Sequence, residues 1–120
     1  MPRNFTINNV QRIVVSRYAG VMTYRDVIRQ WAEIRIHPEY DPSFNYVTDL
    51  TGVTEYKITS DEIHQLVNIH DPFGPTSKRI VVAPTNLLFG MVRMYEMSGQ
   101  LHPGLHAVRA MDEARQILHF

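Results

Sequence analysis

YVTDLTGVTEYKITSDEI, residues 46–63, joins the pattern of a buried strand to the pattern of a helix start. The strand is predicted over 45–50, because the short length of this apolar run and its flanking residues match a buried strand of a parallel sheet. The helix start is predicted at Thr59, because Glu62 follows it at the spacing of a capping box, in which each side chain bonds to the other residue's backbone. A strand that leads into a helix indicates an α/β fold.

The residues before this stretch predict a hairpin and a first helix. Residues 4–7 alternate apolar and polar side chains, and a turn separates them from 10–20, which are rich in β-branched residues. Thr23 stands at a helix N-cap position with Asp26 three residues later. Apolar residues then recur at helical spacing until two prolines interrupt the pattern, so the first helix is expected over about 23–37.

The residues after this stretch repeat the alternation of strand and helix. Further elements are predicted as strands at 79–84 and 106–110 and helices at 60–70, 87–98 and 111–120. Asn86 is expected to cap the helix 87–98, and Gly99 to end it. Alternation implies parallel neighbours joined by right-handed crossovers. We therefore expect an α/β sandwich in a single domain over 1–120, with a mixed, mostly parallel sheet of about five strands, an N-terminal hairpin and four helices.

Composition excludes several classes of protein. The chain has no cysteine, which excludes disulfides, thiolate metal sites and a cysteine nucleophile. It has no apolar stretch near the ~20 residues of a membrane span, and its N-terminus lacks the apolar segment of a signal peptide, so a cytoplasmic location is expected. The formal net charge is +0 without a concentrated basic surface, which argues against nucleic acid as a partner. Residues 36–75 are acidic, either as a solvated face or as a patch for a basic partner.

The segment 49–53, Asp-Leu-Thr-Gly-Val, resembles the Asp-Leu-Ser-Gly-Val pattern of STAS domains, the modules of anti-sigma factor antagonists and sulfate transporter tails. The family continues with Asp-Ser-Ser-Gly, whereas this chain has Lys-Ile-Thr-Ser at 57–60. The stretches GVMTYRDV, HPEYDP, FGMVRMYE and VRAMDEARQIL resemble the SpoIIAA-like branch, small bacterial cytoplasmic proteins. The resemblance spans nearly the whole chain and implies a non-enzymatic regulatory or interaction module. It also implies an alternative, a carrier or sensor of a small apolar ligand or lipid with reversible membrane contact.

Thr59 has two interpretations. In STAS domains the second serine of Asp-Ser-Ser-Gly is phosphorylated at a helix N-terminus, so the resemblance makes Thr59 a candidate phosphorylation site. A phosphate is favoured there by free N–H groups and by the helix dipole, and Lys57 would attract it. The other interpretation is a plain N-cap, which the capping box with Glu62 explains fully.

No group of residues in the sequence indicates a particular reaction. His64 and His70 point in different directions from one helix, and His102 and His106 straddle a proline and a glycine, so no metal site is predicted. No serine lies in a nucleophile elbow, and no acid–base pair is fixed by spacing, so we predict neither enzyme activity nor a cofactor. Asp49 lies near the carboxyl end of a strand, where it is either part of a site or an acceptor for local backbone N–H groups.

The predicted helix 87–98 has apolar residues over more of its surface than the single stripe that usually faces a core. Only Gly90, Arg93 and Glu96 are expected to face water. Neighbouring helices, a homodimer contact or a pocket for an apolar ligand would each cover the remaining surface, and flexible methionines suit a pocket. The loop 71–78, rich in Gly and Pro, is predicted to be mobile and to act as its lid.

These interpretations give one set of candidate residues for ligand or partner binding: Asp49, Thr54, Tyr56, Thr59, Ser60, Asn86, Phe89, Met91, Met94 and Met97. We expect that at least one of Phe89, Met94 and Met97 faces a ligand or a second subunit. The partner is expected to be a protein or a small apolar molecule.

Overall fold

The computed structural model describes residues 3–98 and 105–120. Gly99, predicted to end a helix, and His102 lie outside the described residues. The elements are, in chain order, β1 (Arg3–Asn8), β2 (Ile13–Met22), α1 (Tyr24–Arg35), β3 (Asn45–Tyr56), α2 (Ser60–Ile69), β4 (Arg79–Val82), α3 (Asn86–Ser98), β5 (Leu105–Val108) and α4 (Met111–Leu118). The expected alternation of strands and helices after an N-terminal hairpin is confirmed.

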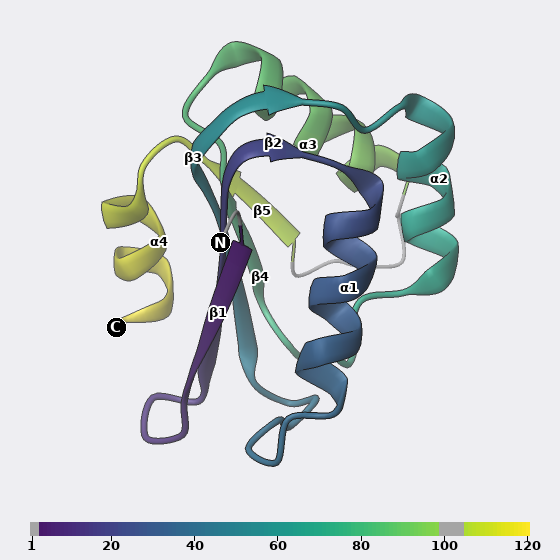
Figure 1. Cartoon of the computed structure of the whole chain (residues 1–120). Coiled ribbons are helices and arrows are strands. Elements are labelled where there is room, and N and C mark those ends of the chain that lie inside the picture. Colours follow the sequence, from purple (N-terminus) through teal and green to yellow (C-terminus); the bar gives the residue numbers. More distant parts are fainter. Residues whose placement is uncertain (1–2, 99–104) are drawn as a thin grey trace.

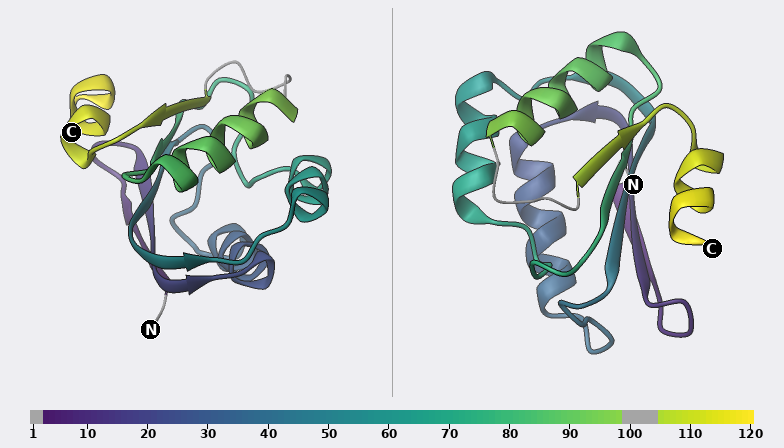
Figure 2. Two further views of the ribbon diagram at one scale, coloured as in Figure 1. Left: turned by 90° about the horizontal axis from the view of Figure 1, so that it is seen from above. Right: turned by 180° about the vertical axis from the view of Figure 1, so that it is seen from behind.

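The sheet has five strands in the order β1-β2-β3-β4-β5. β1 pairs antiparallel with β2, and the remaining pairs are parallel, which confirms the mixed, mostly parallel sheet. Because each crossover advances by one strand in the same direction, right-handed connections must place their helices on one face. Figures 1 and 2 show α1, α2 and α3 on that face and α4 on the other.

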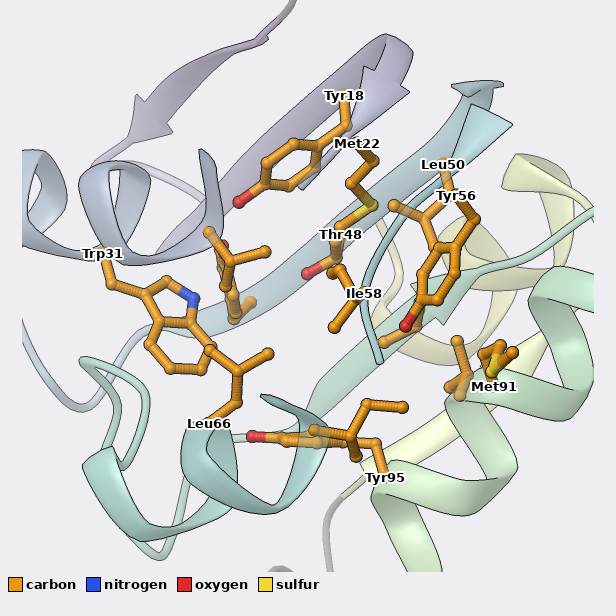
Figure 3. A pocket seen from close by; sticks show the side chains of 15 residues that line it. Tyr18, Met22, Trp31, Thr48, Leu50, Tyr56, Ile58, Leu66, Met91 and Tyr95 are labelled. Atoms are coloured by element: carbon orange, nitrogen blue, oxygen red, sulfur yellow. The ribbon is translucent and has the colours of Figure 1, made fainter. Parts of the chain in front are cut away.

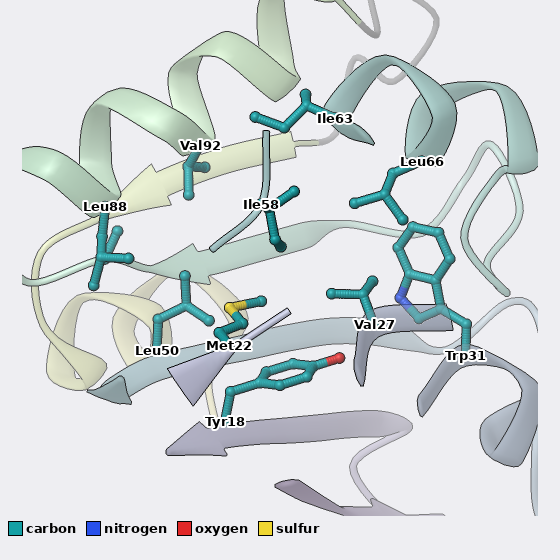
Figure 4. Packing of buried hydrophobic residues seen from close by; sticks show 11 residues of the cluster. Tyr18, Met22, Val27, Trp31, Leu50, Ile58, Ile63, Leu66, Leu88 and Val92 are labelled. Carbon is teal, nitrogen blue, oxygen red and sulfur yellow. The ribbon is translucent and has the colours of Figure 1, made fainter. Parts of the chain in front are cut away.

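Each face of the sheet has its own apolar core. Under α4, Val47, Ile80 and Val82 pack with Ala114, and strand alternation puts them on the face opposite to the three helices. The larger core lies between the sheet and α1, α2 and α3 (Figure 4). Its buried members are Tyr18, Met22, Val27, Trp31, Leu50, Ile58, Ile63, Leu66, Ala83, Leu88 and Val92.

β3 is twice as long as predicted, because it continues beyond Leu50 to Tyr56. Its pairing with β2 shifts register twice, and each shift leaves one additional residue on β3. Such bulges change which side chains face the core. The first bulge turns Val53 to the helix side, and the second restores the original alternation, so that Tyr56 also faces this side. Both residues pack against the larger core.

Two local rules explain the helix starts. The capping boxes predicted for α1 and α2 are confirmed: Thr23 and Thr59 accept the N3 amide, and the N3 side chain accepts the cap amide in return. The prediction for α3 was wrong by one residue, because Thr85 Oγ1 accepts from the Leu88 amide at 3.2 Å, whereas Asn86 is already helical.

Within the part of the chain described, none of the helices combines the length and apolarity needed to cross a bilayer.

The loop 71–78 is anchored, so the prediction of a mobile lid was wrong. Arg79 at the start of β4 forms a buried bidentate ion pair with Asp71, with N–O distances of 2.6 and 2.9 Å. The same guanidinium donates to the carbonyls of Phe73, Gly74 and Ser77. The ring of Phe73 stacks on Tyr46, with centroids 4.6 Å apart. Sequence reasoning missed this because the partner of Asp71 lies beyond the loop.

Removing one partner of this ion pair should destabilise the fold strongly. We expect Arg79→Met to lower the free energy of unfolding by about 3 to 5 kcal/mol, because Asp71 would remain buried and unpaired. Urea unfolding measures the change. The matched control is Arg115→Met, which breaks an exposed pair with Asp112 and should cost less than about 1 kcal/mol. Equal small losses in both variants would contradict a structural role for the pair.

Candidate functional site: an apolar cavity between the sheet and three helices

A cavity of about 90 Å³ lies within the larger core. It is bounded by the sheet and by α1, α2 and α3, and aromatic rings approach it from several sides (Figure 3). The lining residues are Tyr18, Met22, Val27, Trp31, Tyr46, Thr48, Leu50, Tyr56, Ile58, Ile63, Leu66, Val81, Met91, Val92 and Tyr95. None of these side chains carries a charge at neutral pH.

Simple periodicities bring these residues to the cavity. From β3, Tyr46, Thr48 and Leu50 share one face because strand side chains alternate. On α1 and α2 the lining residues are three or four positions apart, which places them one above the other on the inner face, and on α3 Tyr95 follows Met91 and Val92 by four and three positions. Val27 and Trp31 of α1 show this spacing. Tyr56 lies on the same face of β3 as Leu50, because the second bulge in β3 restores the alternation that the first bulge reverses.

Polar atoms around the cavity are few, and most are bonded. The hydroxyl of Tyr46 donates to Ser16 Oγ at 2.7 Å, and the buried Gln30 side chain donates to the same oxygen at 3.1 Å. Tyr95 differs. Among the described residues, its hydroxyl is the one buried side-chain polar atom without a hydrogen-bond partner.

Burial keeps the tyrosine hydroxyls neutral. Desolvation raises the pKa of Tyr46 to about 12 and the pKa of Tyr56 to about 12. Desolvation also raises the pKa of Tyr95, with a further increase from the negative charge of Asp71. These hydroxyls are therefore hydrogen-bond donors, and not anions, over the whole neutral range.

Of the predicted site residues, only Tyr56 and Met91 line the cavity. Asp49 lies on the opposite face, because it alternates with Thr48 and shares the side of Val47. Its Oδ1 accepts from the Thr51 amide at 2.9 Å and from the Thr51 hydroxyl at 2.7 Å. The interpretation of Asp49 as an acceptor for local groups is confirmed.

The other predicted residues lie on the surface or near it. Thr54, Thr59 and Ser60 are exposed, and the Thr59 hydroxyl accepts the Glu62 amide at 3.2 Å. Asn86 accepts from Arg109 at 3.0 Å. Thr54 lines a surface depression together with Tyr56, whereas Thr59, Ser60 and Asn86 do not line it.

The outer side of α3 carries more exposed apolar surface than predicted. Leu87 is 60% exposed and Met97 is 69% exposed, so the expectation that only Gly90, Arg93 and Glu96 face water was wrong. Met94 is partly buried against the larger core, and with Met97 it also lines a shallow depression on the surface. Phe89 packs partly against the core and lies under the guanidinium of Arg109 at 4.1 Å.

Sequence reasoning missed most of the cavity. The sequence pattern identifies several lining residues only as ordinary core positions, because their aromatic rings recur at the spacing of a buried strand or helix face. These residues are Tyr18, Trp31, Tyr46 and Tyr95. The number of tyrosines at core positions could have indicated a site, because the hydroxyl of a buried tyrosine usually needs a hydrogen-bond partner.

No three His, Asp or Glu side chains within 3–98 and 105–120 are grouped so that they could hold a metal ion. Comparison with known proteins gives no assignment either: no family model matches the chain, and no curated protein matches it.

Alkaline pH should destabilise the fold through the buried tyrosines. A pKa of about 12 in the folded state, above the usual value near 10, means that the folded protein holds the proton more tightly than the unfolded chain. The resulting stabilisation is complete below about pH 10 and is lost as pH rises toward 12, by on the order of 2 to 3 kcal/mol for Tyr46. Urea unfolding at several alkaline pH values measures this loss. Tyr46→Phe should show a smaller slope, and an equal slope in both proteins would contradict the assignment.

Proposed function

We propose that the protein is a non-enzymatic module that binds a small, uncharged, mainly apolar molecule in this cavity. The observation that carries the proposal is a preformed space of about 90 Å³ with no charged lining residue. Ligand sites are typically concave, mostly apolar and largely preformed, with a few polar groups that fix orientation. A charged ligand is disfavoured, because an ion moved into such a lining would lose its hydration without gaining a partner.

The volume limits the size of the ligand. An apolar cavity of about 150 Å³ in another protein binds benzene and stays free of water. The smaller space here suits a molecule of a few carbon atoms, and a long lipid chain would require the helices to move apart. The alternative role expected from the sequence is a carrier or sensor of a small apolar ligand or lipid, and the volume supports the small ligand better than the lipid.

We also propose the SpoIIAA-like branch of the STAS superfamily as the family. The five-stranded mixed sheet, the N-terminal hairpin and the four helices are compatible with it. In this proposal the module works in a bacterial cytoplasm, and occupancy of the cavity alters contacts with a protein partner. Phosphorylation of Thr59 stays a prediction, supported by the exposure of this residue at the start of α2.

Trp31 offers a direct test of binding, because it is the sole tryptophan of the chain and lines the cavity. We expect isopentane to produce a saturable change in tryptophan fluorescence and a rise in melting temperature, since a ligand that binds only the folded state stabilises it. Val81→Met, which fills the space from β4, should abolish both effects. Val10→Met is the matched control, because Val10 is 93% exposed, and it should bind like the wild type. A change that does not saturate, or that persists unaltered in Val81→Met, would refute the site.

Protein interaction is a second candidate function, favoured by the exposed Leu87 and Met97 on α3. We expect the wild type to form a homodimer through this face. Met97→Lys should give a monomer, because a buried unpaired ammonium is costly. Ile36→Lys, at the C-cap of α1, where the apolar side chain is 83% exposed, should remain dimeric. Light scattering distinguishes these states, and a monomeric wild type at high concentration would exclude the homodimer.

A further inference from the structure

We infer that the ligand of the cavity carries a neutral hydrogen-bond acceptor, such as a ketone, ether or alcohol oxygen, and that the hydroxyl of Tyr95 donates to it. This inference rests on the proposed function, because it names the chemical class of molecule that the same cavity takes. Tyr95 would thus be the residue that determines specificity.

The first argument is the cost of leaving a hydroxyl unbonded. A buried polar group without a partner destabilises the fold, and native proteins contain few such groups. The Tyr95 hydroxyl is such a group among the described residues. It belongs to a side chain that lines the cavity, where a bound molecule can supply the missing acceptor.

The second argument is that the polar groups nearest to Tyr95 form their hydrogen bonds with other partners. In Figure 3 the Tyr95 ring extends from α3 toward α2, the helix that carries Leu66. The nearby Tyr46 hydroxyl is bonded to Ser16, and both carboxylate oxygens of Asp71 accept from Arg79. A ligand therefore meets a free donor at one end of an otherwise apolar space.

The third argument concerns charge. Burial raises the pKa of Tyr95, so its hydroxyl keeps its proton and acts as a donor. The guanidinium of Arg79 is already paired with Asp71, and it also donates to three backbone carbonyls. Its charge is balanced by Asp71, and Arg79 is not one of the residues that line the cavity. The acceptor on the ligand must therefore be uncharged.

Three probes test separately for binding of an apolar molecule, of a neutral acceptor and of a charged acceptor. Isopentane, butanone and propionate share one branched skeleton of non-hydrogen atoms, and they end respectively in a methyl group, a carbonyl oxygen and a carboxylate. Their affinities are measured by Trp31 fluorescence with the wild type and with Tyr95→Phe, which removes only the hydroxyl. For each probe, the affinity of Tyr95→Phe is compared with that of the wild type. The affinities of different probes are not compared directly, because the ketone loses more hydration on binding than the hydrocarbon does.

We expect Tyr95→Phe to weaken butanone binding about tenfold, corresponding to a hydrogen bond of about 1.4 kcal/mol, and to leave isopentane binding unchanged or tighter. Propionate should not bind at neutral pH to either protein. A thermal melt shows whether Tyr95→Phe is folded, and its melting temperature should equal or exceed that of the wild type.

The outcomes separate the inference from the proposed function. If no probe binds the wild type, the proposed function fails. If isopentane binds but the substitution leaves butanone unaffected, or weakens both probes equally, the inference about Tyr95 is overturned while the cavity remains a binding site. Saturable binding of propionate would also overturn it, because it would show that the cavity accepts a charge.

Discussion

The handedness of the crossovers is the constraint on which the remaining architecture depends. Because the parallel strands β2 to β5 follow one another in sequential order, every right-handed connection deposits its helix on the same face of the sheet. Three helices then share one apolar face, and α4 alone covers the opposite side. The cavity forms on the crowded side, where side chains from three helices and several strands must fill a single space.

Local chemistry explains what the sequence predicted well. The capping boxes at Thr23 and Thr59 depend on residues three positions apart, so each could be identified without the fold. The anchored loop could not, because the bond between Asp71 and Arg79 reflects the tertiary position of β4. The side of the sheet on which Asp49 lies depends on how β3 pairs with β2. The Tyr95 hydroxyl has no hydrogen-bond partner because the tertiary fold brings no acceptor to it, and no spacing of residues in the sequence reveals this.

The buried polar groups fall into two kinds with different roles. Gln30, Ser16 and Tyr46 form a chain of hydrogen bonds that ties α1 to β2 and β3, and Gln30 also donates to the carbonyl of Asn4 in β1. A satisfied network of this kind fixes one arrangement of its elements. The Tyr95 hydroxyl lies outside that network. The helix layer is thus held rigidly on the side of α1, while α3 keeps a polar group available at the cavity.

The close approach of β2 and β3 at Gly52 has a consequence for how the chain folds. A Cβ atom added there would lie 3.1 Å from both the Ala19 side chain and the Tyr18 carbonyl oxygen. A slip of β3 by one position would bring Thr51 or Val53 into that narrow space and would also turn its apolar side chains away from the helices. The glycine of the Asp-Leu-Thr-Gly-Val segment therefore favours the strand alignment in which the smallest residue lies opposite Ala19, because a larger residue there would force its neighbours to shift.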